Sequence, residues 1–304
     1  MPDSAFKEVG IALIAPSGYA PDEAAYERGV TRLKEFGFKV IDYYRPEQKF
    51  QRFGDSDQAR LQQLHDATDN PDVQVVLGVR GGYGVSRILP QIDFKKLAAS
   101  GKLFVGHSDF TPIHLGLLGE GANSFAGPFI IPDFAADTLN EFAMEQFRHC
   151  LSCATHSVTG RGESNPPTDV SGMLWGGNLA MITHMVGSPY LPQIEGGILF
   201  LEDIAEHPYR VERMLLQLLH CGILQKQRAI LLGDFSAYKL SDYDNGYDFD
   251  AMVAYIRSRL DIPVITGLPF GHVLQKATLA VGADARLVSD GENWQLAMTG
   301  YRHL

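Results

Sequence analysis

Residues 73–84 read VQVVLGVRGGYG, an almost wholly apolar run that ends in a glycine-rich turn. An apolar run of this length is typical of a strand that is buried on both faces, as in a parallel sheet covered by helices. The glycines predict a tight turn, and residues 85–89 predict a short helix after it. The stretch therefore indicates one strand, turn and helix unit of an α/β protein.

The same alternation extends to both sides of this stretch. Further strands are predicted at residues 9–15, 38–43 and 102–106, and helices at 23–36, 57–69 and 111–118. This order predicts an N-terminal domain with a parallel α/β sheet, which we place at residues 1–150. Residues 159–169 are polar and rich in Gly and Pro, which favours a linker over 151–172. Residues 173–304 hold mixed short strands with few helices and predict an α+β C-terminal domain.

Composition excludes several classes of function. The 304 residues carry a formal net charge of -10, which argues against a nucleic-acid partner. No run of about 18 apolar residues occurs, so we expect no membrane span. The N-terminus lacks a basic segment followed by an apolar one, so we expect no signal peptide and a cytoplasmic protein. Three cysteines do not suggest a disulfide framework, and we expect neither a metal nor a cofactor.

The glycine-rich turn at Arg80–Gly84 does not fit a phosphate-binding pattern. The dinucleotide fingerprint needs a glycine where this sequence has Arg87, and no P-loop pattern is present. The backbone N–H groups of Gly81 and Gly82 could instead form an oxyanion pocket. The alternative is a tight turn that binds nothing.

A second turn, GHSDF at residues 106–110, also lies between a predicted buried strand and a helix. Ligands of open α/β sheets bind at the carboxyl ends of the strands, where Ser108 would lie. Ser108 is therefore a candidate nucleophile, and the N–H of Asp109 could stabilise an oxyanion. On local grounds Ser108 could equally be an ordinary helix N-cap.

A serine nucleophile needs a base and a group that orients the base. His272 lies in TGLPFGH, residues 266–272, where Gly and Pro would hold its side chain in one place. Glu202 ends the apolar run LFLE, and a buried carboxylate needs a partner such as an imidazole. Glu202 could pair with an arginine instead, and His272 could be an exposed loop residue.

Together, these segments resemble the LD-carboxypeptidase family, the murein tetrapeptide carboxypeptidases. The matching segments follow one another in the family's order and span most of the chain: IAPSG at 14–18, VRGGYG at 79–84, GHSDF at 106–110, LWGGNL at 174–179, LEDI at 201–204, VERML at 211–215 and GLPFGH at 267–272.

The resemblance implies a serine peptidase with a triad of Ser108, Glu202 and His272. The expected reaction is hydrolysis of the bond between an L-centre and the terminal D-alanine of a murein tetrapeptide, free or muropeptide-linked, during cell-wall recycling in the cytoplasm. It further implies an active site between the two domains, no metal and a homodimer. Diaminopimelate and lysine substrates are not distinguished.

In this mechanism Ser108 attacks the scissile carbonyl and His272 transfers the proton to the leaving nitrogen. The N–H groups of Gly81, Gly82 and Asp109 are expected to bind the oxyanion. Arg80 is a candidate for the substrate carboxylate, since arginine binds carboxylates bidentately. Further candidates for the substrate pocket are Tyr83, Trp175 and Asn178, and Trp175 could instead be a packing residue.

Two alternatives compete with this assignment. One is a self-immunity peptidase of the same family that cleaves an aminoacyl-nucleotide antibiotic, which would need aromatic side chains to stack on the base. The other is a binding module that captures a peptide or sugar without turnover and leaves Ser108 unreactive.

Overall fold

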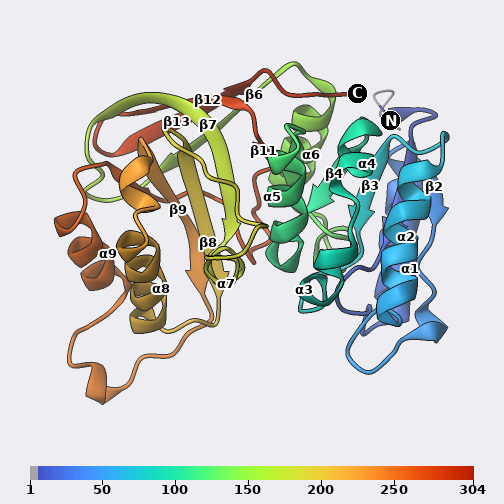
Figure 1. The fold of residues 1–304 in the computed structure, drawn as a ribbon, viewed down its shortest axis with the longest axis horizontal. Coiled ribbons are helices and arrows are strands. Elements are labelled where there is room, and N and C mark those ends of the chain that lie inside the picture. Colours follow the sequence, from blue (N-terminus) through green and yellow to red (C-terminus); the bar gives the residue numbers. More distant parts are fainter. Residues whose placement is uncertain (1–5) are drawn as a thin grey trace.

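The computed structural model describes residues 6–304 and contains two β-sheets that stand side by side (Figure 1). The expectation about a signal peptide concerns in part residues 1–5, which lie outside the described residues. The first sheet is parallel except at one edge. Its strand order is β11 (Leu279–Val281), β5 (Ser124–Ala126), β4 (Leu103–Gly106), β3 (Val75–Gly78), β1 (Gly10–Ile14) and β2 (Lys39–Asp42).

Helices cover both faces of the first sheet. Alternate strand residues such as Leu77 and Val76 belong to different hydrophobic clusters, because successive side chains of a strand point to opposite faces. One face packs against α1 (Glu23–Glu35) and α6 (Glu141–Ser152), and the other against α2 (Asp57–Asp69), α3 (Val85–Ile88), α4 (Phe94–Ala99) and α5 (Thr111–Gly119). The near-continuous apolar runs follow from this double burial.

The second sheet is mixed. It runs β10 (Val264–Thr266), β9 (Ala229–Ser236), β8 (Ile198–Ile204), β7 (Thr168–Asn178), β12 (Asp284–Ser289), β13 (Asn293–Thr299) and β6 (Thr155–Arg161). Strands β7 to β10 are parallel and β12, β13 and β6 pair antiparallel. Its helices are α7 (Leu179–His184), α8 (Pro208–His220) and α9 (Phe249–Ser258).

Short helical turns complete the chain and connect the longer elements. They are η2 (Pro46–Gln48), η3 (Leu89–Gln91), η4 (Ser108–Phe110), the π-helical η5 (Ile130–Phe134), η6 (Leu224–Lys226) and η7 (Asp242–Asp244). The mixed α/β class, with a mostly parallel first sheet and a second sheet of mixed strands, confirms the fold predicted from the sequence.

The structure differs from the predicted domain limits in two places. Residues 151–172 hold β6 and the start of β7, so only residues 162–167 form an irregular connection, and even there Asn165 is buried. Strand β11 lies in the C-terminal half of the sequence but pairs with β5 in the first sheet. The chain therefore crosses back from the second sheet to the first to form β11, before β12 and β13 complete the second sheet.

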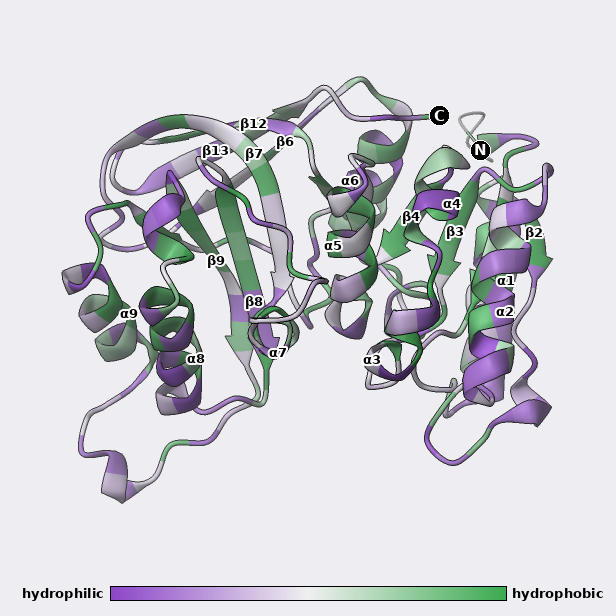
Figure 2. Cartoon of the chain, viewed as in Figure 1, coloured by the Kyte–Doolittle hydropathy of each residue, from purple (hydrophilic) through white to green (hydrophobic). Residues whose placement is uncertain are grey.

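The two halves share their hydrophobic interior. One cluster joins Phe125 of the first sheet to Leu174 and Leu296 of the second. In Figure 2 the strands are largely hydrophobic, whereas the outer faces of α1 and α2 are hydrophilic. Helix α5 of the first half contacts β7 and α7 of the second. The carboxyl ends of β4 and β8 are thereby held near one another.

Candidate active site

Ser108 lies two residues after the end of β4, at the start of η4, with a left-handed backbone (φ 56°). This conformation is unfavourable for a residue with a side chain and costs about 1–3 kcal/mol. The Thr111 hydroxyl donates to the Ser108 carbonyl at 2.7 Å and helps to hold the turn. Strained backbone of this kind often occurs at functional sites.

His272 lies on the segment that crosses from β10 to β11, that is, from the second sheet to the first. Gly271 before it has φ 140°, and a Cβ there would lie 3.0 Å from the Asp234 Cβ, so the position requires glycine. Phe270 is buried against Phe200, with ring centroids 5.5 Å apart. The turn is thus fixed by packing on one side and by close backbone contact on the other.

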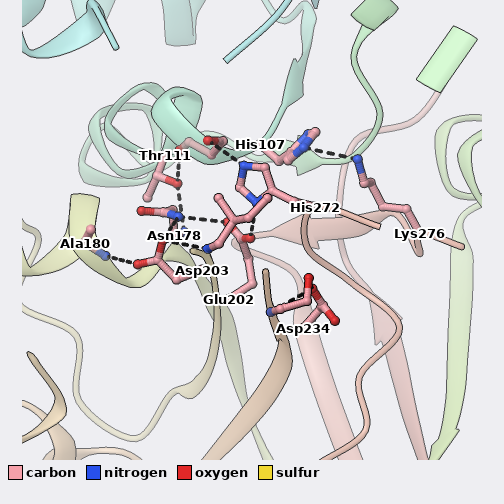
Figure 3. Close-up of polar contacts among 12 residues, drawn as sticks. His107, Thr111, Asn178, Ala180, Glu202, Asp203, Asp234, His272 and Lys276 are labelled. Atoms are coloured by element: carbon pink, nitrogen blue, oxygen red, sulfur yellow. Dashed lines mark hydrogen bonds and ion pairs between the residues drawn. The ribbon is translucent and has the colours of Figure 1, made fainter. Parts of the chain in front are cut away.

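The three side chains that the sequence singles out meet in one hydrogen-bonded chain (Figure 3). The Ser108 hydroxyl lies 3.0 Å from Nε2 of His272, and Nδ1 of His272 lies 2.8 Å from Oε2 of Glu202. A carboxylate can only accept, so Nδ1 carries the proton and Nε2 is free to accept the hydroxyl proton. This is the geometry of an activated serine.

Burial lowers the pKa of His272, but the hydrogen bond and charge of Glu202 outweigh it and leave the pKa above its usual value. Glu202 is fully buried. Its second oxygen accepts from the Asn178 amide at 3.2 Å. Asn178 therefore orients the carboxylate and does not face an open pocket, unlike the substrate-binding role predicted from the sequence.

Asp203 is a second carboxylate beside Glu202. It accepts from the Asn178 amide at 3.0 Å and from the Ala180 backbone N–H at 2.9 Å. Burial, followed by the charge of Glu202, raises the pKa of Asp203 to about 6. Glu202, and not the neighbouring Asp203, makes the hydrogen bond to the imidazole of His272.

The Asp109 carboxylate points away from the nucleophile. It accepts from the Ser17 hydroxyl at 2.7 Å and from the Val85 N–H at 3.0 Å, and burial raises its pKa to about 6. Asp109 thereby ties together the loops that hold Ser17, Val85 and Ser108, while its backbone N–H stays next to the nucleophile.

The glycine-rich turn after β3 lies against Ser108. A Cβ on Gly81 would lie 3.1 Å from both the Cβ and the Oγ of Ser108. Gly82 has φ 105°, and no atom would contact its Cβ within 4 Å. The turn therefore brings its backbone beside the nucleophile, as a donor to an oxyanion must be placed.

The other three residues predicted to bind substrate differ in solvent exposure. Arg80 is half-buried, with Nη1 3.4 Å from the Tyr19 carbonyl. Tyr83 is exposed, and its ring lies tilted against that of Phe53 with ring centroids 6.0 Å apart. Trp175 is buried, and its indole N–H donates to Gln227 at 2.8 Å. Trp175 is hence a packing residue, and its prediction as part of the pocket is wrong.

A cavity of about 810 Å³ lies beside the His272 turn. Asp234 lines it and also contacts Gly271, which precedes His272. Other lining residues come from the end of β9 and the start of α9: Phe235, Ser236, Tyr238, Asp248 and Phe249. Ser108, Glu202 and His272 are not among its lining residues, so the cavity lies to one side of the triad.

Comparison with known proteins agrees with this geometry. The model of the LD-carboxypeptidase N-terminal domain matches residues 11–127, and that of the LD-carboxypeptidase C-terminal domain matches residues 171–287. The chain belongs to the LD-carboxypeptidase family. It is therefore a hydrolase of a serine-type carboxypeptidase family, as the sequence motifs predict.

Relatives in the LD-carboxypeptidase family carry two kinds of name. A muramoyltetrapeptide carboxypeptidase from Oxalobacter formigenes is 52% identical, with a TM-score of 0.93 over 97% of this chain and 100% of that one. The murein tetrapeptide carboxypeptidase of Pseudomonas aeruginosa is 29% identical over 93% of this chain and 94% of its own. The microcin C7 self-immunity protein of Escherichia coli is 25% identical over 90% and 87%.

Sequence reasoning missed two residues of this LD-carboxypeptidase site. Thr111 was predicted only as the first residue of the helix at 111–118, yet its hydroxyl joins the nucleophile turn to the second half by accepting from the Asn178 N–H at 3.0 Å. Lys276 was not singled out, although it is a lone charge in the apolar run that follows His272. Within residues 6–304 no group of three or more His, Cys, Asp or Glu could hold a metal, and no helix could span a membrane.

Proposed function

We propose that the protein hydrolyses the L,D-peptide bond to the terminal D-alanine of murein tetrapeptides. The observation that carries this proposal is the hydrogen-bonded chain from Ser108 through His272 to Glu202. The names of the Oxalobacter and Pseudomonas relatives support the choice of substrate. A role in cell-wall peptide recycling follows from that substrate.

The reaction proceeds in two halves. The Ser108 oxygen attacks the scissile carbonyl carbon while Nε2 of His272 takes the hydroxyl proton. Backbone N–H groups of Gly81, Gly82 and Asp109 stabilise the tetrahedral oxyanion, and each lowers the barrier by about 3 kcal/mol. The C–N bond then breaks, and His272 gives its proton to the nitrogen of D-alanine.

Water completes the cycle. His272, again neutral, takes a proton from a water molecule whose oxygen attacks the acyl carbon of Ser108. The ester bond breaks, the proton passes to the Ser108 oxygen, and the tripeptide acid leaves. Glu202 stays ionised and stabilises the imidazolium in both halves.

A carboxypeptidase must also recognise the terminal carboxylate. Arg80 is our candidate, because it lies next to Gly81 in the turn that faces Ser108, and its guanidinium is only partly buried. Tyr83 borders the same turn and offers an exposed ring. Neither side chain takes part in the hydrogen bonds of the triad, so both can be replaced in tests of substrate binding.

The buried tryptophans disfavour the nucleotide-cleaving alternative. The chain has two tryptophans, and Trp175 and Trp294 are 1% and 3% exposed. Neither offers a free face on which a nucleobase could stack. Tyr83 is the exposed ring beside the nucleophile turn, so the choice of a muropeptide over an aminoacyl-nucleotide rests on the buried tryptophans together with the names of the Oxalobacter and Pseudomonas relatives.

Mass spectrometry of a tetrapeptide incubated with the protein tests the proposal. We expect loss of one D-alanine with wild type and none with Ser108→Ala. An aminoacyl-nucleotide substrate in a parallel reaction distinguishes the self-immunity activity. Tight binding without turnover, and no labelling of Ser108 by a fluorophosphonate, would instead indicate a binding module.

Three further expectations remain proposals. We propose a homodimer, a cytoplasmic location and a division into two domains near residues 150–172. Light scattering of the purified protein tests the first, and cell fractionation tests the second. Limited proteolysis tests the third, since we expect the first cleavage within the irregular residues 162–167, and first cleavage elsewhere would contradict this boundary.

A further inference from the structure

A buried ionic cluster lies behind His272, outside the contacts of the proposed mechanism (Figure 3). The Lys276 ammonium lies 2.9 and 3.0 Å from the two carboxylate oxygens of Asp133 and 3.1 Å from Nε2 of His107. The side chains of Lys276 and Asp133 are 1% and 2% exposed. Burying such a pair costs desolvation free energy, so stability alone explains it poorly.

His107 acts in this cluster as a neutral acceptor. Its Nδ1 lies 2.9 Å from the Gly127 carbonyl, which can only accept, so Nδ1 carries the proton. Nε2 then has the lone pair that accepts from Lys276. Burial, followed by the Lys276 charge, lowers the pKa of His107 well below its usual value, which agrees with this tautomer.

The cluster joins the two turns that carry the nucleophile and the base. His107 directly precedes Ser108, and its ring lies edge-on to that of His272 with centroids 5.3 Å apart. Asp133 belongs to η5, and the N–H of Phe129, the residue before η5, also donates to it at 2.8 Å. Lys276 lies between His272 and β11, so it fastens the His272 segment to the first half.

We propose that Lys276 is a positioning residue, which fixes the His272 turn against the Ser108 turn and opposes protonation of the His272 imidazole with its charge. The proposal rests on the proposed role of His272 as the general base. It extends that role to a residue that contacts neither Ser108 nor His272 by any hydrogen bond found among residues 6–304.

Charges of both signs face His272. Glu202 and Asp203 on β8 favour the imidazolium, and Lys276 on its own segment opposes it. His107 faces it from the end of β4 as a neutral ring, and Asp234 of β9 packs against Gly271. A base held only by carboxylates would keep its proton too firmly, so a nearby cation favours release to the leaving group.

The experiment measures the His272 pKa by NMR of histidine-labelled protein, with His272→Gln to assign the signal. In Lys276→Met we expect this pKa to rise by roughly half a unit or more, because a buried cation is gone. The kcat for D-alanine release should fall about tenfold or more with KM nearly unchanged, since the base is misplaced. Lys276→Arg keeps the charge, so its His272 pKa and its kcat should both lie close to the wild-type values.

Lys96→Met is the matched control. Lys96 pairs with Asp69 on the surface at 2.6 Å, with 37% and 60% of the two side chains exposed. The same substitution there should leave the His272 pKa and kcat unchanged. If Lys276→Met does not fold, the double variant Lys276→Met/Asp133→Asn leaves no unpaired buried charge and should show a smaller rise.

The outcomes separate the inference from the proposed function. An unchanged or lowered His272 pKa in the folded variants overturns the inference, whether or not the wild type cleaves a tetrapeptide. A raised pKa with unchanged kcat overturns the positioning role. A wild type that releases no D-alanine overturns the substrate assignment, while the NMR titration still tests the role of Lys276.

Discussion

The hydroxyl of Thr111 donates to the carbonyl of Ser108 at 2.7 Å, and so holds the residue that carries the nucleophile in its left-handed conformation. The same oxygen accepts from the Asn178 N–H at 3.0 Å. Asn178 in turn donates to Glu202 at 3.2 Å. The Thr111 hydroxyl thereby links the backbone of Ser108 to that of Asn178, whose side chain holds Glu202 at the other end of the triad.

We predict that Thr111→Val lowers kcat about tenfold and destabilises the fold by about 1–3 kcal/mol, because the Asn178 N–H and the Ser108 carbonyl lose a buried partner. Steady-state kinetics and urea unfolding measure the two effects. Thr111→Ser, which keeps the hydroxyl, should recover most of the loss. The same exchange at the exposed Thr159 of β6 is the control. Equal kinetics of Thr111→Val and wild type would contradict the proposed link.

Glu202→Gln should preserve the fold but cut kcat by a factor on the order of 10³–10⁴, as for loss of the orienting carboxylate in other serine peptidases. The amide can still accept from Asn178, but it no longer stabilises the imidazolium. Glu195→Gln is the matched control, since Glu195 forms a surface pair with Lys226. Near-normal turnover of Glu202→Gln would reject Glu202 as the orienting group.

Gly81→Ala should lower kcat about a hundredfold, because its Cβ would meet Ser108 at 3.1 Å and displace either the nucleophile or an oxyanion donor. Gly119→Ala is a control of the same chemistry, since no atom lies within 4 Å of the new Cβ. Thermal unfolding should change little in either variant. A Gly81→Ala enzyme as active as the control would place the oxyanion elsewhere.

Activity should rise with pH through the pKa of His272, because only the neutral imidazole can accept the Ser108 proton. Glu202 outweighs burial and keeps this pKa above its usual value of 6.5. The half-maximum of kcat/KM should therefore lie above pH 6.5, and the stabilisation from the His272–Glu202 pair is present below that pH and lost as pH rises through the raised pKa. A pH profile of kcat/KM measures the first effect. A half-maximum below pH 6.5 would show that another group controls the reaction.

Much of the first sheet can be predicted from the sequence, because strands buried on both faces are continuous apolar runs. The predicted strands at 73–79 and 102–106 correspond to β3 and β4, and the predicted helix at 111–118 to α5. Strand β6 was missed, because its outward residues are polar and its inward ones few. Strand β11 is three residues long, and its pairing with β5 depends on the tertiary fold.

The candidate site divides in the same way. Ser108, Glu202 and His272 were predicted because each ends a strand or lies in a rigid turn within a recognisable motif. The role of Asn178 and the burial of Trp175 could not be predicted, because the sequence of β7 does not show which side chains point into the core and which point toward the site. The Lys276 cluster joins three segments far apart in the chain, and no local pattern encodes it.

The pairing of β11 with β5 has a consequence for how this architecture can be rearranged. A fragment that stops before residue 279 would leave β5 as a bare sheet edge, open to self-association. The halves are thus interlaced and could not be exchanged between relatives as independent modules. His272 lies on the segment that crosses from β10 of the second sheet to β11 of the first. A sliding motion of one sheet against the other would therefore separate the His272 imidazole from the Ser108 hydroxyl.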